Sequence, residues 1–154
     1  VIVRSSFPAE DGTRTYAGVF VSVRDVAPTV SAVMEAVREV VASNSSFARL
    51  KISLTKANLM DLCVSRLFSA EMVRRNKPAP DLHLHIASNF EVSPKDCLVI
   101  EDSPAGVKAA LDAGMRVIGF TRGSHMTPKH IELLKEAGAK SLVRNTDELS
   151  VLLG

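Results

Sequence analysis

The stretch CLVIEDSPAGVKAALDAGM, Cys97 to Met115, joins a short apolar run to the start of a helix. The run LVI has the length and composition of a buried strand, and the following Ser103 and Pro104 are typical of a helix N-cap and first turn. Two acids, Glu101 and Asp102, stand between the strand and the helix. Because a carboxylate is costly to bury without a partner, this pattern predicts a cation beside them.

Outward from this stretch, helical and strand patterns alternate along the chain. Apolar residues recur at helical spacing at Val30, Val33 and Val37, at Phe47, Leu50 and Leu54, at Leu82, Ile86 and Phe90, at Val107, Ala110 and Leu111, from Pro128 to Ala137, and through Leu149 and Leu152. Short runs typical of strands are VVAS, RLFSA, CLVI, RVIGF and SLV. This alternation predicts an α/β fold, a doubly wound parallel sheet covered on both faces, in which ligands gather at the carboxyl ends of the strands.

The first residues do not fit the alternation. VFVSV, Val19 to Val23, is typical of a single strand, but no helical pattern surrounds it. We therefore expect two parts: residues 1–27 as an atypical N-terminal segment, and residues 28–154 as the core of the domain.

Composition limits the class of protein. A chain of 154 residues with 46% hydrophobic and 23% charged residues is the size of one globular domain. The net charge of +2 is too mild for a nucleic-acid surface, and no apolar stretch approaches the roughly 20 residues of a membrane helix. The two cysteines, Cys63 and Cys97, form no disulfide framework, which favours a cytoplasmic location. A small-molecule partner is therefore expected.

The acid pair is a candidate metal site. Glu101 and Asp102 offer two hard oxygen ligands at a strand end, which suits Mg²⁺ completed by water and substrate phosphate. The alternative is an interaction with the helix dipole, which stabilises acids near a helix N-terminus by about 0.3–1 kcal/mol without any metal.

A second candidate site follows the strand VVAS. Ser43 and Asn44 precede a helix, where a hydroxyl and unpaired backbone N–H groups favour an anion such as phosphate. The alternative is ordinary N-capping of that helix by Ser45 or Ser46.

The third candidate is Lys77, in the stretch KPAPD. Two prolines stiffen this loop, so its ammonium is held with less freedom than on an ordinary loop and suits a phosphate oxygen or a carboxylate. The alternative is a solvated surface lysine.

The order VASNSS, KPAPD and VIEDSPAGVKAALDAGM resembles motifs two, three and four of the haloacid dehalogenase superfamily of phosphohydrolases, and most closely its β-phosphoglucomutase-like and sugar-phosphate phosphatase branch. The resemblance runs from about Pro28 to Leu153 and implies the Rossmann-like core of that superfamily. By this resemblance Ser43 and Asn44 bind phosphate, Lys77 neutralises the phosphoryl charge, and Glu101 with Asp102 holds Mg²⁺; Ser43 and Lys77 are then the catalytic residues.

The family's first motif, DxDGT, is not recognisable. AEDGT at Ala9 to Thr13 has alanine in place of the nucleophilic aspartate, and DVAPT at Asp25 to Thr29 lacks the second aspartate. The family's helical cap domain is not evident either. In the family's sheet the first-motif strand lies between those of motifs two and four, so this slot must be filled by VFVSV, by the initial VIV or by another chain, unless the sequence is a truncated product. Filling by another chain would make a homo-oligomer by strand exchange.

The resulting expectation is an Mg²⁺-dependent phosphohydrolase acting on a small phosphorylated metabolite, inactive in this form if no nucleophile is present. The alternative is a non-catalytic remnant that serves as a binding or interaction module. A receiver-like phosphoacceptor domain is disfavoured, because no acceptor aspartate is evident at a central strand end.

Overall fold

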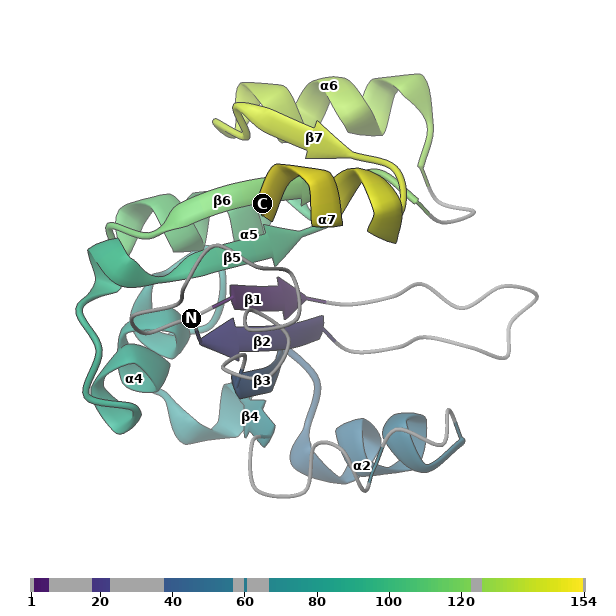
Figure 1. Ribbon diagram of the computed structural model, residues 1–154. Helices are drawn as coiled ribbons and strands as arrows, with labels where there is room; N and C mark the ends of the chain where they lie inside the picture. The colour runs from purple at the N-terminus through teal and green to yellow at the C-terminus, as the bar shows by residue number, and fades with distance from the viewer. Residues whose placement is uncertain are drawn as a thin grey trace.

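The computed structural model describes residues 2–5, 18–22, 38–56, 60, 67–122 and 126–153. They form one sheet flanked by helices (Figure 1). The strands are β1 (Ile2–Ser5), β2 (Gly18–Ser22), β3 (Arg38–Ser43), β4 (Leu67–Ser69), β5 (Leu98–Glu101), β6 (Arg116–Phe120) and β7 (Ser141–Val143). The helices are α2 (Phe47–Lys56), α4 (Asp81–Asn89), α5 (Pro104–Asp112), α6 (Pro128–Glu136) and α7 (Thr146–Leu153), with short 3₁₀ turns η1 (Ala70–Met72) and η2 (Pro94–Asp96). The helix expected through Val30, Val33 and Val37, and the stretches AEDGT and DVAPT, lie outside the described residues.

The strand order is β4-β3-β2-β1-β5-β6-β7. Neighbours pair in parallel throughout, except that β2 runs antiparallel to both β1 and β3; β1 also pairs in parallel with β3. The predicted α/β fold with a doubly wound sheet is therefore confirmed, with one antiparallel strand added.

The slot between β3 and β5 is filled from within the chain. The sequence left open whether VFVSV or VIV would fill it, and the structure places β1 and β2 there together. The N-terminal segment thus joins the same sheet as the core. Strand exchange between copies is not needed to complete the sheet, and it stays a prediction.

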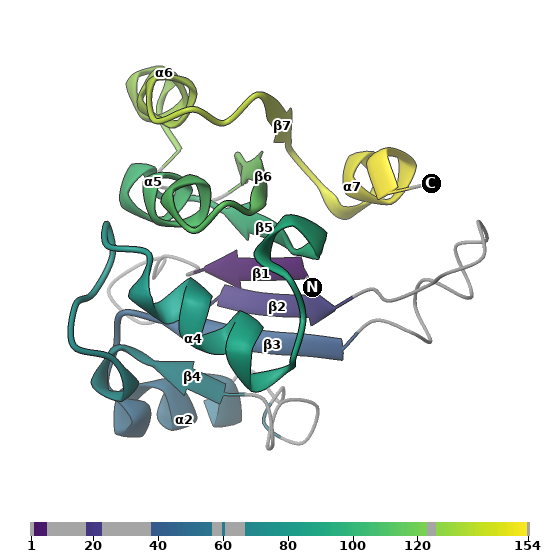
Figure 2. The same ribbon diagram turned by 90° about the vertical axis from the view of Figure 1, so that its left-hand side faces the viewer.

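The helices lie on both faces of the sheet, as the alternation along β4 demonstrates. Leu67 packs with Leu50 and Leu54 of α2, whereas the next residue, Phe68, packs with Leu82 and other residues of α4 and α5. Successive strand residues point to opposite faces, so α2 and α4 cover opposite faces. Figure 2 shows α5 and α6 on one side of β6 and β7, with α7 on the other.

Helix α5 begins with the N-cap and first-turn proline that the sequence predicts, and it ends at a glycine. The Ser103 hydroxyl accepts a hydrogen bond from the Gly106 N–H at 3.1 Å, and proline occupies the first turn. At the other end Gly114 has a φ of 77°, and the amides of Gly114 and Met115 donate to the carbonyls of Leu111 and Ala110 at 2.9 and 3.0 Å. This is a Schellman ending, which needs the left-handed backbone that glycine adopts freely.

The helices that the structure describes are short. Helix α2 has 10 residues and α4, α5 and α6 have 9 each. Within the described ranges none has the length and apolar character needed to cross a membrane.

Candidate active site

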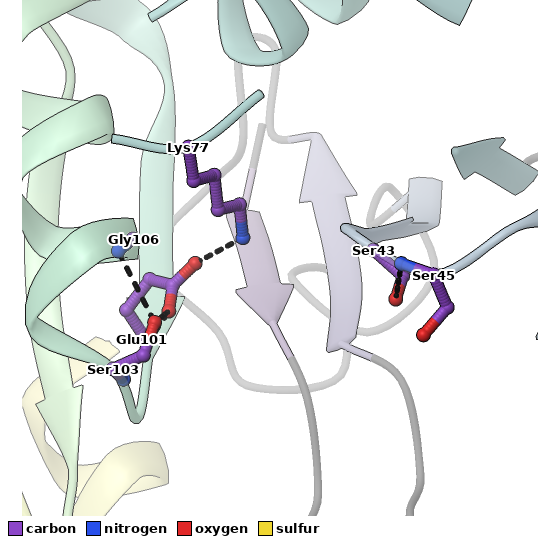
Figure 3. A network of polar contacts seen from close by, with 6 residues as sticks. All are labelled: Ser43, Ser45, Lys77, Glu101, Ser103 and Gly106. Carbon is purple, nitrogen blue, oxygen red and sulfur yellow. Dashed lines mark hydrogen bonds and ion pairs between the residues drawn. The ribbon is translucent and has the colours of Figure 1, made fainter. Parts of the chain in front are cut away.

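Lys77 lies in the loop between η1 and α4, and its side chain turns inward. Its ammonium forms an ion pair with the Glu101 carboxylate, and the two side chains are 3% and 0% exposed (Figure 3). The sequence predicted a phosphate oxygen or a carboxylate as its partner, and the structure supplies the carboxylate. A solvated surface lysine is excluded by this burial.

A single ion pair, between Arg75 before Lys77 and Asp81 after it, closes the loop that carries Lys77. Arg75 Nη2 and Nε lie 2.8 and 3.1 Å from the two carboxylate oxygens of Asp81, a forked geometry that fixes both direction and distance. The guanidinium lowers the pKa of Asp81, and the carboxylate raises the pKa of Arg75, chiefly through these hydrogen bonds. Between these two residues the chain makes a turn, in which the Ala79 N–H donates to the Asn76 carbonyl at 2.9 Å.

Glu101 ends β5 and is held from several directions. Its Oε2 accepts hydrogen bonds from the Ser103 hydroxyl at 3.0 Å and from the Ser103 N–H at 3.4 Å, while Oε1 meets Lys77. Gly106 lies directly against the carboxylate: a Cβ on that glycine would stand 1.9–2.0 Å from the carboxylate atoms. The side chain of Glu101 can therefore occupy this position only because residue 106 has none.

Asp102 is buried, with 5% of its surface exposed, and follows Glu101 at the carboxyl end of β5. His130 of α6 lies 2.8 Å through Nε2 from the Asp102 backbone carbonyl. Since a carbonyl can only accept, His130 Nε2 carries the proton and donates it. This contact ties α6 to the strand end. This contact could not be predicted from the sequence, because it depends on how α6 packs.

Ser43 ends β3 and is also buried, at 4% exposure. Its hydroxyl accepts a hydrogen bond from the Ser45 N–H at 3.0 Å, which folds the chain back at the strand end; Asn44 beside it is exposed. The capping alternative is also realised in part, because the Ser46 hydroxyl accepts from the Arg49 N–H at 3.4 Å. A further contact at this helix start, the Phe47 N–H donating to Glu71 at 2.9 Å, could not be found from the sequence.

The predicted site residues therefore form two groups at the side of the sheet where the parallel strands have their carboxyl ends. Strands β3 and β5 both run parallel to β1, so Ser43 and Glu101 end at the same edge. Lys77 and Glu101 are in contact, whereas Ser43 lies across β1 and β2 from them (Figure 3). The structure joins the lysine to Glu101 and leaves the serine on the opposite side of the central strands.

His83, in the first turns of α4, is another ionisable group near Lys77. Its side chain is buried, and burial together with the positive charge of Lys77 holds its pKa well below the ordinary value. The imidazole is therefore neutral at pH 7. Lys77 thus has an acid as its ion-pair partner and an uncharged ring within electrostatic reach.

The described residues contain no group of three His, Cys, Asp or Glu side chains that could hold a metal ion. The oxygen chemistry of the acid pair suits Mg²⁺, which commonly takes only one or two carboxylates. Both carboxylate oxygens of Glu101 already have partners, so a cation bound by Glu101 would have to replace one of them.

Comparison with known proteins agrees with this fold. A 6-phosphogluconate phosphatase from Escherichia coli (strain K12) is 34% identical over 88 residues, 57% of this chain and 40% of that protein. The beta-phosphoglucomutase of Bacillus subtilis (strain 168) is 38% identical over 79 residues, 51% of this chain and 30% of the enzyme. The solved structure of a HAD family hydrolase from Deinococcus radiodurans R1 matches with 33% identity and a TM-score of 0.69, over 74% of this chain and 50% of that one.

The chain thus spans half or less of the length of each of these proteins. A family model described as haloacid dehalogenase-like hydrolase matches residues 8–114, well over half of the 154 residues. The resemblance found in the sequence is therefore confirmed, and the chain belongs to the haloacid dehalogenase-like hydrolases.

Proposed function

We propose that this chain carries a phosphohydrolase site of the haloacid dehalogenase type for a small phosphorylated metabolite, of the sugar-phosphate class, with Mg²⁺ as cofactor. The observation that carries the proposal is the buried ammonium of Lys77, fixed by Glu101 at the sheet edge where Ser43 and Asp102 also lie. The names of the relatives, a 6-phosphogluconate phosphatase and a beta-phosphoglucomutase, support the substrate class. The Deinococcus radiodurans structure is described with bound phosphate and sodium, which supports a phosphate ligand and a cation for this family member.

Lys77 would neutralise charge on the phosphoryl group. An ammonium has three donors, and its bond to Glu101 uses one of them, which leaves two for phosphoryl oxygens. A fixed positive charge in a site from which water is excluded stabilises developing negative charge far better than a mobile one in water. Positioning and charge neutralisation supply most of the catalysis in phosphoryl transfer.

Ser43 would bind a phosphoryl oxygen together with the backbone N–H of Asn44. Its oxygen already accepts from the Ser45 N–H, so the hydroxyl proton is the part of the group that serves a ligand. Since Ser43 and Lys77 lie on either side of the central strands, the proposal places the phosphoryl group above the ends of those strands, between the two side chains.

Asp102 would hold the cation, with water and substrate oxygens completing its shell, as is common for Mg²⁺. When bound, Mg²⁺ withdraws charge from the phosphoryl oxygens as a Lewis acid. That Glu101 is a second ligand stays a prediction.

Hydrolysis of p-nitrophenyl phosphate by the purified chain tests the proposal. We expect turnover that requires Mg²⁺, is abolished by EDTA, and falls by about 100-fold in Lys77→Met, because a preorganised charge is lost. Lys108→Met is the matched control, since Lys108 forms an exposed ion pair with Asp112 at 2.9 Å on the surface of α5. Equal rates in the two lysine variants would contradict the proposal.

A non-catalytic binding module is the second candidate. The sequence feature that favours it is that the motif DxDGT, which carries the family's nucleophilic aspartate, is not recognisable in AEDGT or in DVAPT. Trapping an aspartyl-phosphate on any acid of residues 1–30, detected by mass spectrometry, would exclude the binding module. Binding of inorganic phosphate and Mg²⁺ without turnover would favour it.

A further inference from the structure

The start of helix α2 is held by a residue from outside the helix. The Phe47 N–H, the first amide of α2, donates to the Glu71 carboxylate at 2.9 Å across 24 positions of sequence. The first amides of a helix have no partner within it, and α2 has no acidic residue of its own in the first turn. Its N-cap, Ser46, accepts a long bond from the Arg49 N–H at 3.4 Å. Glu71 therefore supplies the negative charge that the helix start favours.

The two strand ends beside this contact are built alike. Ser43 and Ser69 are register partners at the ends of the parallel strands β3 and β4, and both are buried. Each hydroxyl accepts from the N–H two residues further on, which belongs to Ser45 at 3.0 Å and to Glu71 at 3.3 Å. Two anchored turns thus lie on neighbouring strands, and the Glu71 side chain reaches from the second turn to the helix that follows the first.

We infer that Glu71 is a positioning residue of the candidate phosphate site. Its backbone is held by Ser69 and its carboxylate is held by α2, so Glu71 ties the turn of Ser43 to the end of β4 (Figure 3 shows this turn). The loop that carries Lys77 follows directly from η1, the 3₁₀ turn that contains Glu71. Glu71 therefore relates the two groups of site residues through one short segment. The inference rests on the proposed function for its meaning in catalysis.

This role depends on accepting a hydrogen bond and not on contact with a ligand. Glu71 is exposed, and its negative charge would repel a phosphoryl group. In Glu71→Gln an amide oxygen can still accept from the Phe47 N–H although the charge is lost, whereas Glu71→Ala loses both. A purely electrostatic effect of Glu71 would make phosphate bind more tightly in both variants, because each removes a negative charge. A positioning role separates the two variants.

Hydrogen exchange of backbone amides, followed by NMR, tests the contact without a ligand. In Glu71→Ala we expect the amides of Phe47 and Ser45 both to exchange about tenfold faster, because losing this bond loosens the turn as well as the helix start. Glu71→Gln should retain slow exchange. Glu148→Ala is the matched control, since the exposed Glu148 also accepts a backbone N–H, that of Arg144 at 2.7 Å, beside α7. Faster exchange at Phe47 alone would make Glu71 an ordinary helix cap and would overturn the inference.

Titration with inorganic phosphate in the presence of Mg²⁺, followed by calorimetry, tests the consequence for the site. We expect the affinity to fall about tenfold in Glu71→Ala and to be retained in Glu71→Gln and in Glu148→Ala. Both alanine variants lose one such bond, so a general loss of stability would affect them alike. Unchanged or tighter binding in Glu71→Ala would overturn the inference. If the wild type binds no phosphate, the proposed function fails, and the exchange of the Ser45 amide still decides whether Glu71 positions the turn.

Discussion

The ion pair between Lys77 and Glu101 should be worth far more to stability than an ordinary surface pair. Its two side chains are 3% and 0% exposed, so either charge left alone would be buried without compensation. Removing one partner of such a pair typically costs about 3–5 kcal/mol, whereas replacing both with neutral groups of similar size is often close to neutral. We therefore expect Lys77→Met and Glu101→Gln to be severely destabilising one at a time, and the double variant to recover most of that loss.

Urea denaturation followed by circular dichroism measures the effect. With a slope of about 2 kcal/mol/M, each single variant should lower the midpoint by about 1.5–2.5 M, and the double variant by less than about 1 M. The control pair is Lys108 and Asp112, whose side chains are 59% and 44% exposed and four residues apart on α5. Replacing either member should change stability by about 0.5 kcal/mol or less.

A double-mutant cycle measures how strongly the charges of Lys77 and Glu101 depend on each other. Strong coupling requires the loss in the double variant to be smaller than the sum of the two single losses by at least about 2 kcal/mol. Additive losses would show that the two charges do not depend on each other in solution. Losses as small as those of the control pair would show that the site is hydrated and that the burial of the pair does not hold.

Three further predictions concern other sites. Gly119→Ala should cost about 1–3 kcal/mol in thermal unfolding because its Cβ would overlap Leu142 at 2.4 Å, and an unchanged midpoint would mean that this side chain moves aside freely. The free energy of unfolding should fall as the pH drops below about 6.5, because His83 takes up a proton there in the unfolded chain, whereas the buried imidazole, with its lowered pKa, does not. His83→Gln should flatten the dependence of stability on pH between about pH 5 and about pH 7. Equal slopes in the wild type and the variant would contradict this role. Ser43→Ala should raise the KM for p-nitrophenyl phosphate more than Ser46→Ala does, since only Ser43 is placed at the proposed phosphoryl site; equal effects would remove it from that site.

Much of the fold could be predicted because its signals are local. Helix α5 has its N-cap, its first-turn proline and its terminal glycine within one stretch, and the strands on either side of it are short apolar runs. The antiparallel β2 could not be predicted from such signals. Alternation of apolar residues predicts that a strand is present, but the direction of the strand and its neighbours depend on the rest of the sheet.

The candidate site could be predicted only in part. The spacing of motifs identified Ser43, Lys77 and the acid pair, and the structure places all of them at one sheet edge. Which acid meets the lysine depends on side-chain direction at the strand end and on the empty space above Gly106, neither of which a linear pattern contains. The contact of His130 with the Asp102 carbonyl likewise comes from helix packing.

Strand β4 has a consequence for how this chain tolerates insertions and deletions. It is only three residues long, yet Leu67 belongs to the apolar cluster under α2 and Phe68 to the one under α4. One residue gained or lost within the strand would shift its register by one and direct each following side chain to the opposite face. Length changes within β4 should therefore be far more damaging than its small size suggests.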